Sequence, residues 1–212
     1  MVFQHFRKID FLQINKSFEW PENERENYRK ILDLILDNID KENITNMEQA
    51  IRVLQKFTMF FDFWLVVYVT AKVTKPKLVL ETGVSEGYST YAILRALQGE
   101  LYSIDVHPNA GWLVSNKKNW HLIVGRTENE LRPCLEKINE VDFVCHDSAH
   151  NMKIQFEEYK IMWSHLVSGG VLISDDLTHA FKKFTDKKKD EIKETFVIGK
   201  KSNRLIGIII KK

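Results

Sequence analysis

The sequence predicts an α/β fold with a doubly wound, mostly parallel sheet, a C-terminal antiparallel hairpin and an N-terminal helical layer. Three observations predict it. From Lys77 onward, short apolar runs alternate with amphipathic segments. These runs are apolar on both faces, as in strands of a parallel sheet covered by helices on each side. The last two runs lie on either side of a tight turn at Ser202-Asn203, which is typical of a hairpin.

Length and composition predict one full-sized domain with a small extension. The chain has 212 residues, of which 44% are apolar and 28% are charged, the balance of a chain that buries a large core. The formal net charge is only +2. So small a charge argues against general attraction to nucleic acid or to an anionic membrane, and we expect neither as a partner.

Cysteine usage and the N-terminus favour a reducing location. Cys134 and Cys145 lie in an expected helix and an expected buried strand, and the N-terminal residues lack the charged-then-apolar order of a signal peptide. We therefore expect a cytoplasmic protein. The stretch Phe57–Val73 is the most apolar of the chain, but Asp62 interrupts it and it is shorter than a membrane span. It is interpreted as a buried helix that belongs to the core or to a dimer interface, so homo-oligomerisation is left open.

The division expected from the sequence is an N-terminal helical extension over residues 1–75 and a second domain over residues 76–212. The extension contains a helix after Pro21, and another that Thr45 or Asn46 would cap before it continues into the aromatic stretch. In the second domain, the alternation predicts five strands with a helical segment after each. The strands are expected at Lys77–Thr82, Leu101–Val106, His121–Arg126, Asp142–Asp147 and Gly169–Asp176. The helical segments after the first four strands are expected at Tyr88–Leu97, Asn109–Lys118, Asn129–Ile138 and Ile154–Leu166. The two hairpin strands are expected at Glu194–Lys201 and Arg204–Lys212.

Acidic residues stand at four of the five predicted parallel strand ends. In open α/β sheets, ligands bind beyond the carboxyl ends of the strands, so these positions are the first candidates for a site. The candidates are Glu81, Asp105, Gly125–Glu128, Asp147–His150 and Asp175-Asp176.

The loop E-T-G-V-S-E-G-Y-S-T follows the first strand. Gly83 and Gly87 permit a tight turn and close approach of a ligand to the backbone, and Ser89 and Thr90 offer hydroxyl groups at a helix start. Glu81 would oppose a phosphate and suits a cationic ammonium or sulfonium group. An ordinary strand-to-helix turn is the alternative interpretation.

Asp105 ends the second strand, 24 residues after Glu81, a spacing at which an acid receives the ribose hydroxyls of a bound nucleoside. A capping or surface aspartate is the alternative when Asp105 is considered by itself. The loop and the acid together make a coincidence much less probable than either does alone.

These features resemble class I S-adenosylmethionine-dependent methyltransferases, which have a Rossmann-like sheet. The loop E-T-G-V-S-E-G-Y-S-T looks most like that of the catechol O-methyltransferase and macrolide-sugar O-methyltransferase group, over about residues 77–212. The resemblance implies an enzyme that binds S-adenosylmethionine. It implies that Ser89 holds the methionine carboxylate, that Asp105 binds ribose, and that the remaining cofactor contacts come from Glu81, Gly83, Ser85, Gly87, Gly125, Thr127 and Asp147.

Three aspartates follow neighbouring strands and are expected to converge. Carboxylates this close would repel each other, and a hard cation such as Mg²⁺ would relieve the repulsion. The sequence therefore predicts a metal site at Asp147, Asp175 and Asp176, and in the resembled group such a triple holds the metal that binds the acceptor hydroxyls. The alternative is that Asp176 caps the next helix and Asp175 is solvated.

His150 follows Asp147 by three residues, at the place where the catechol group has a lysine base. A histidine is a suitable general base near neutral pH, so His150 and Asp147 are the catalytic candidates. The replacement puts a catechol-like acceptor in doubt. His146 and His150 as a zinc pair is a weaker alternative, because no matching cluster of cysteines or histidines occurs elsewhere.

The sequence therefore predicts a Mg²⁺-assisted O-methyltransferase for a small hydroxylated acceptor. A metal-independent methyltransferase for another acceptor is the first alternative, and a non-catalytic or hydroxylase-like relative of the same fold is the second. A dehydrogenase is disfavoured because the glycine pattern is incomplete. The Lys-rich segment 182–194 is interpreted as a solvated helix face or loop near the mouth of the site.

Overall fold

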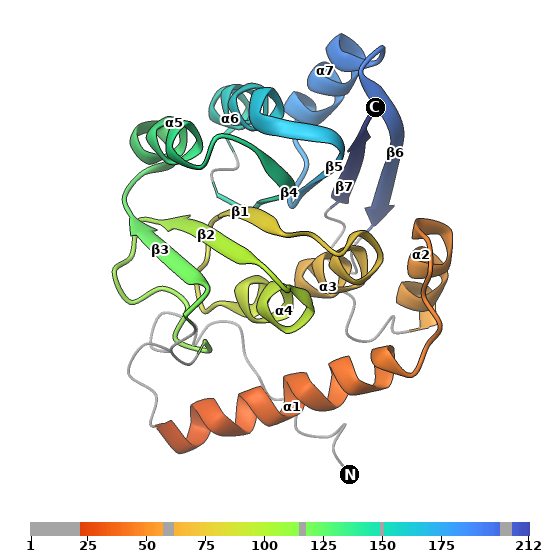
Figure 1. Cartoon of the computed structure of the whole chain (residues 1–212), viewed down its shortest axis with the longest axis vertical. Coiled ribbons are helices and arrows are strands. Elements are labelled where there is room, and N and C mark those ends of the chain that lie inside the picture. The colour runs from red at the N-terminus through yellow and green to blue at the C-terminus, as the bar shows by residue number, and fades with distance from the viewer. Residues whose placement is uncertain (1–21, 57–61, 115–117, 149–150, 200–204) are drawn as a thin grey trace.

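The structure is a computed structural model, and it describes residues 22–56, 62–114, 118–148, 151–199 and 205–212. Within these ranges, no helix is both long and apolar enough to cross a lipid bilayer. The described chain forms a central sheet between two layers of helices, with one further helix outside (Figure 1).

The sheet has seven strands in the order β3-β2-β1-β4-β5-β7-β6. Strands β1 to β5 pair in parallel, and β7 pairs antiparallel with both β5 and β6. The prediction of a mostly parallel sheet closed by an antiparallel hairpin is therefore confirmed. The strands are β1 Leu78–Thr82, β2 Glu100–Asp105, β3 Trp120–Val124, β4 Val141–His146, β5 Leu166–Ser174, β6 Ile192–Gly199 and β7 Leu205–Lys211.

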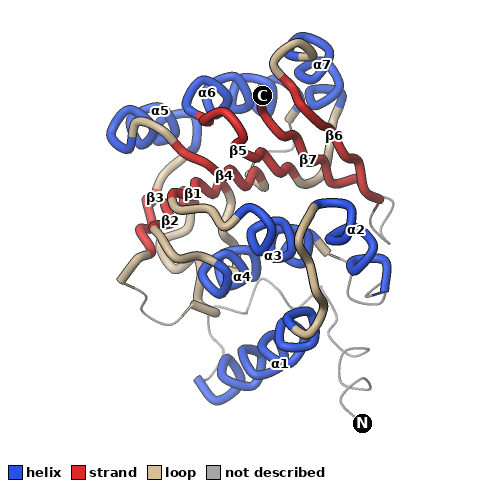
Figure 2. The backbone as a smooth tube through the Cα atoms, turned by 45° about the vertical axis from the view of Figure 1, so that its right-hand side comes forward, coloured by secondary structure: helices blue, strands red, loops and turns tan. Residues whose placement is uncertain are grey.

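Helices cover both faces of the sheet (Figure 2). Adjacent strand residues alternate between two cores because successive side chains point to opposite faces. Val79 and its partner Phe143 pack against the helices α2 Met47–Lys56, α3 Phe63–Thr74 and α4 Tyr88–Ala96. Leu80 and its partner Val144 pack against α5 Thr127–Ile138, α6 Met152–His165 and α7 His179–Lys188. The strands are thus apolar on both faces, as the sequence predicts.

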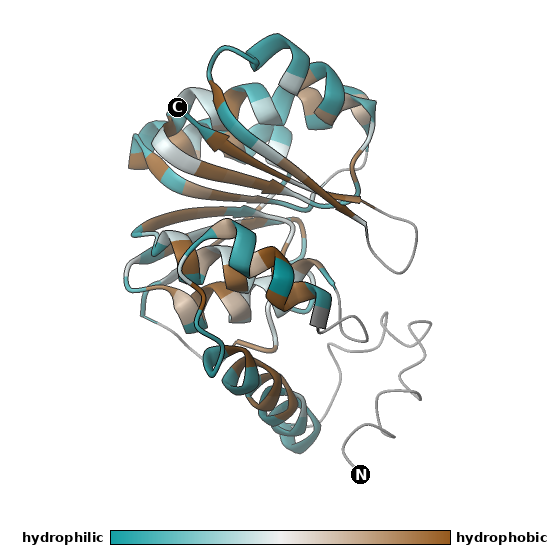
Figure 3. Ribbon diagram, turned by 90° about the vertical axis from the view of Figure 1, so that its right-hand side faces the viewer, coloured by the Kyte–Doolittle hydropathy of each residue, from teal (hydrophilic) through white to brown (hydrophobic). Residues whose placement is uncertain are grey.

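The N-terminal helices pack against this arrangement of one sheet between helices. Helix α1, Glu22–Asp40, forms an outer layer beside α3 and α4, and its hydrophobic stripe faces them (Figure 3). Helix α3 is buried over most of its length and shares its core with strands β1, β4, β5 and β7. The division at residue 75 stays a prediction. Helix α3, which belongs to the predicted extension, packs directly on the sheet.

Two local predictions differ from the structure. The helix expected to run into the aromatic stretch ends at Lys56, and Asp62 begins a separate helix α3 by accepting a hydrogen bond from the Phe63 N–H. Residues 57–61 lie outside the described ranges. After β2, residues 106–114 form turns, because the N–H groups of Gly111 and Leu113 donate to the loop after β1 instead of to their own segment.

Candidate functional site

The loop after β1 depends on its two glycines. Gly83 and Gly87 have φ angles of +80° and +94°, in the left-handed region that favours glycine. A Cβ atom on Gly83 would lie 2.0 Å from the Asp147 carbonyl oxygen, and one on Gly87 would lie 2.8 Å from the Cα of Gly111. The loop is therefore packed between the end of β4 and the segment after β2. The predicted tight turn before a helix is confirmed, because α4 begins at Tyr88 with Gly87 as its N-cap.

Glu81 lies beneath this loop, with only 1% of its surface exposed. Its carboxylate accepts hydrogen bonds from the hydroxyls of Ser89, Thr90 and Ser103 at 2.6, 2.7 and 2.7 Å. Burial raises the pKa of Glu81, and these hydroxyl donors offset only part of that rise. The side chain thus supports the loop from below, and the Ser89 hydroxyl assigned to the methionine carboxylate is bonded to Glu81 in this structure.

Asp105 joins the ends of β1 and β2. Its Oδ2 accepts the backbone N–H groups of Val84 and Ser85 at 2.7 and 3.0 Å, and its Oδ1 accepts that of His107 at 2.8 Å. Ser85 has a φ of 50°, an uncommon conformation for a residue other than glycine. The carboxylate therefore fixes the loop conformation and remains partly accessible to a ligand.

Gly125 and Thr127, two of the predicted cofactor contacts, follow β3 next to Asp105. The N–H of Gly125 donates to the Asp105 carbonyl at 2.8 Å. Thr127 is the first residue of α5 and is buried. A Cβ on Gly125 would lie 2.5 Å from the Glu130 side chain, which would have to move to make room for it. The structure thus brings Gly125 and Thr127 to the same edge of the sheet as Asp105.

A buried polar network lies at the ends of β4 and β5, and the sequence analysis did not anticipate it. His146 Nε2 lies 2.6 Å from Glu158 Oε2, and its Nδ1 lies 3.2 Å from the hydroxyl of Ser174. The Ser148 hydroxyl donates to Glu158 at 2.9 Å, and the Tyr159 hydroxyl lies 2.6 Å from that of Ser174. Because both ring nitrogens of His146 have protein partners, the zinc alternative loses support.

Glu158 and His146 are both buried. Burial by itself raises the pKa of Glu158, but the hydrogen bond and charge interaction with His146, together with hydrogen bonds from Thr127 and Ser148, bring the pKa below its usual value. The sequence offered one weak signal for this pair. Glu157 and Glu158 are adjacent acids in an amphipathic helix, and the pattern alone does not decide which of them faces the sheet.

The predicted metal ligands lie near one another along the backbone. The Asp175 N–H donates to the His146 carbonyl at 2.9 Å, so Asp175 lies beside the residue that precedes Asp147. Asp175 is buried, and helix α7 is capped by Thr178. The alternative of a solvated Asp175 and a capping Asp176 is therefore wrong. Even so, within the described ranges, no three histidine, cysteine, aspartate or glutamate side chains are grouped as a metal site requires.

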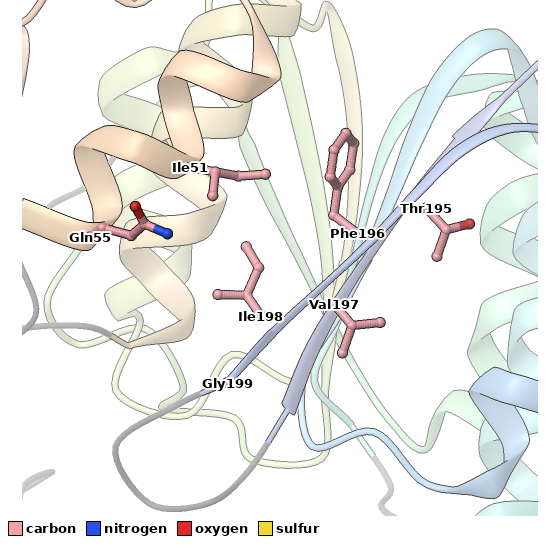
Figure 4. A pocket seen from close by; sticks show the side chains of 7 residues that line it. All are labelled: Ile51, Gln55, Thr195, Phe196, Val197, Ile198 and Gly199. Atoms are coloured by element: carbon pink, nitrogen blue, oxygen red, sulfur yellow. The ribbon is translucent and has the colours of Figure 1, made fainter.

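The catalytic candidate His150 lies outside the described residues, so its role stays a prediction. Its neighbour Asn151 caps α6 by accepting the N–H groups of Lys153 and Ile154 at 2.9 and 3.3 Å. A surface groove of about 560 Å³ lies elsewhere, between α2 and β6, where Ile51, Phe196 and Ile198 face one another (Figure 4). Among the described residues, none of the predicted site residues lines this groove.

Comparison with known proteins identifies the domain. Residues 80–177 match a family model described as a methyltransferase domain. Over residues 80–177 the chain is therefore similar to methyltransferase domains. The resemblance drawn from the loop after β1 is thus confirmed, and the matched range includes the predicted site residues from Glu81 to Asp176.

Solved structures support this domain through their fold. An O-methyltransferase from Bacillus cereus in complex with S-adenosylhomocysteine (SAH) has 15% sequence identity and a TM-score of 0.57, with 88% of this chain and 100% of that chain covered. The SAH-bound methyltransferase PaMTH1 of Podospora anserina has 18% identity and a TM-score of 0.55, covering 86% and 96%.

A third similar structure contains a metal. The MycE methyltransferase from the mycinamycin biosynthetic pathway, in complex with Mg and SAH, has 15% identity and a TM-score of 0.53, covering 68% of this chain and 47% of that chain. At such identities the likeness shows the fold alone. A search among curated proteins found no match.

Proposed function

We propose that this methyltransferase domain binds S-adenosylmethionine and methylates an oxygen of a small hydroxylated acceptor. The observation that carries the proposal is the fixed position of Asp105 between the glycine loop and Gly125. Three backbone N–H groups occupy three of the about four lone-pair sites of its carboxylate, which leaves one on Oδ1 for a ribose hydroxyl. The SAH-bound neighbours with the same fold support a cofactor of this class.

Different residues around the loop would bind different parts of the cofactor. The backbone of residues 83–87 forms the floor for the methionine part, and Asp105 with Gly125 and Thr127 forms the nucleoside side. S-adenosylmethionine, when bound, supplies an electrophilic methyl group on a sulfonium. Much of the rate enhancement would come from holding the acceptor oxygen in line with that group.

His150 is the proposed general base. It would remove the proton of the acceptor hydroxyl as the oxygen becomes the nucleophile. His146 ends β4 and Ser148 precedes His150 by two residues in the sequence, and Glu158 of α6 is bonded to both His146 and Ser148. The acceptor itself is proposed only as a small molecule. A cytoplasmic location also stays a prediction.

Assistance of the reaction by a metal ion is a more detailed proposal, which rests on the carboxylate groups that could bind the ion. Asp147, Asp175 and Asp176 offer the hard oxygen ligands that Mg²⁺ prefers. The described residues do not gather three such side chains, so we derive no step through a metal. That same observation favours a metal-independent methyltransferase as the second candidate function.

The metal proposal has a direct calorimetric test. Titration with Mg²⁺ in the presence of SAH should give a binding signal that Asp175→Asn abolishes. Asp186→Asn is the control, because Asp186 is an exposed acid paired with Lys182 on α7. A wild-type protein without any Mg²⁺ signal, together with unchanged turnover in a chelator, would instead establish the metal-independent reaction.

The cofactor proposal is tested by calorimetric titration of wild-type protein and Asp105→Ala with SAH. Loss of charge-assisted hydrogen bonds, at about 1.5 to 3 kcal/mol, should weaken binding about ten- to hundredfold. Asp142→Ala is a matched control. Asp142 also accepts two backbone N–H groups, of Lys77 and Leu78 at 2.9 and 3.1 Å, but at the opposite edge of the sheet. Equal weakening in both variants would refute the ribose assignment, and no binding by the wild type would refute the cofactor.

A further inference from the structure

Helix α1 contacts the segment that follows Asp105. Arg29 on α1 is mostly buried, with a side-chain exposure of 13%. Its Nε donates to the Leu113 carbonyl at 2.8 Å, and its Nη2 donates to the Trp112 carbonyl at 3.3 Å. One guanidinium therefore binds two successive carbonyl groups in a part of the chain that is far away in sequence.

Further contacts hold the Arg29 side chain and the segment in place. Its Nη1 donates to Glu22 at 2.5 Å and to Glu26 at 3.4 Å, both within α1. The Tyr28 ring meets the Trp112 ring edge-on at a centroid distance of 6.4 Å. These interactions orient the guanidinium, so its donors are arranged in advance for the two carbonyls.

The same segment is bonded to the glycine loop on its other side. The Gly111 N–H donates to the Ser85 carbonyl at 2.8 Å, and the Leu113 N–H donates to the Glu86 carbonyl at 3.1 Å. The backbone of Leu113 thus links the two regions, because its carbonyl accepts from Arg29 while its N–H donates to the loop. Leu113 itself is fully buried.

The loop needs such support. Ser85 has a φ of 50°, and uncommon backbone conformations persist only where the surroundings fix them. Asp105 binds the Ser85 N–H from one side, and Gly111 binds its carbonyl from the other. Removing the second support would leave the loop free to relax away from the geometry that binds a ligand.

We propose that Arg29 is a positioning residue for the cofactor site, through which the N-terminal helix α1 holds the glycine loop in its binding conformation by way of Trp112 and Leu113. The inference rests on the proposed cofactor binding. It makes the N-terminal extension part of the site, although α1 lies outside the matched methyltransferase range.

The test compares two arginines that both tie α1 to the rest of the chain. Arg29→Met keeps an apolar stem but has no donor for the two carbonyls. Arg95→Met is the control, because Arg95 on α4 bonds Asp37 of α1 at 2.7 Å and its other acidic neighbours, Asp33 and Asp40, also lie on α1. Arg29→Met should raise the dissociation constant of SAH about fivefold or more, and Arg95→Met should leave it unchanged.

Two further readouts separate positioning from a general structural effect. Arg29→Met should raise the KM for S-adenosylmethionine more than it lowers kcat, because it weakens binding without removing a reacting group. Amide hydrogen exchange should speed up at Ser85, Gly111 and Leu113 in this variant and not in Arg95→Met. If Arg29→Met does not fold, Arg29→Gln replaces it, with the same expectations.

The outcomes are distinct. Wild-type protein that does not bind SAH overturns both this inference and the proposed function. Wild-type protein that binds SAH while the folded Arg29 variant binds equally well overturns the inference alone. Equal weakening in the Arg29 and Arg95 variants also overturns it, because loosening of α1 in general would then explain the loss.

Discussion

Glu81 and Glu158 are both buried glutamates near the strand ends, but they are stabilised in different ways. Glu81 is surrounded by three hydroxyl groups and has a raised pKa, whereas Glu158 faces His146 and has a lowered one. Burial raises the pKa in both cases. At Glu81 the hydroxyl donors offset only part of the effect of burial, whereas at Glu158 a histidine acts together with hydroxyl donors and the pKa falls below its ordinary value.

The two glutamates belong to different halves of the candidate site, one at the ends of β1 and β2 and the other at the ends of β4 and β5. The half at β1 and β2 uses Glu81 and Asp105 to shape a loop with neutral donors. The half at β4 and β5 holds its strand ends through an acid–base pair, directly before the predicted catalytic positions Asp147 and His150. We therefore expect the second half to respond more strongly to removal of a single group.

The largest expected effect is that of Glu158→Ala. It leaves His146 buried without its carboxylate, and breaking a buried pair typically costs about 3 to 5 kcal/mol of the free energy of unfolding. Urea denaturation at neutral pH measures this loss. Glu157→Ala is the matched control, because the neighbouring acid is exposed and pairs with Lys160 on the surface, so no measurable change is expected. Similar midpoints for the two variants would contradict the importance assigned to the buried pair.

The sequence predicted the strands and the positions of their ends better than it predicted the contacts of individual site residues. Apolar runs on both faces predicted the parallel strands, and the ends of those strands located Glu81, Asp105, Asp147 and Asp175 at one edge of the sheet. These predictions succeeded because they depend on local pattern and on a general property of α/β sheets.

The details depended on contacts between distant segments. The partner of His146 comes from α6, and Arg29 reaches residues 112 and 113 from α1. The segment after β2 was expected to be helical, but its N–H groups bond to the loop after β1 instead. Propensity is a weak guide where tertiary hydrogen bonds compete with it, so these features could not be predicted from the sequence.

A smaller effect, of opposite sign for the two glutamates, is expected in the pH dependence of stability. Between the ordinary glutamate pKa and the raised pKa of Glu81, the folded state binds more protons than the unfolded state, so Glu81 makes stability fall as pH rises through this window. Glu158 has a lowered pKa, so its contribution is present above the ordinary value and is lost as pH falls through the folded pKa.

Urea denaturation of wild-type protein, Glu81→Gln and Glu158→Gln from acidic to neutral pH separates these contributions. The free energy of unfolding of Glu81→Gln relative to wild type should increase with pH above the ordinary glutamate value, by up to about 1.4 kcal/mol per pH unit within the window. The difference for Glu158→Gln should instead shrink as pH falls below that value. Two difference curves with the same sign of slope would mean that hydroxyl donors and a histidine stabilise a buried carboxylate equivalently, and the distinction between the two halves of the site would then be lost.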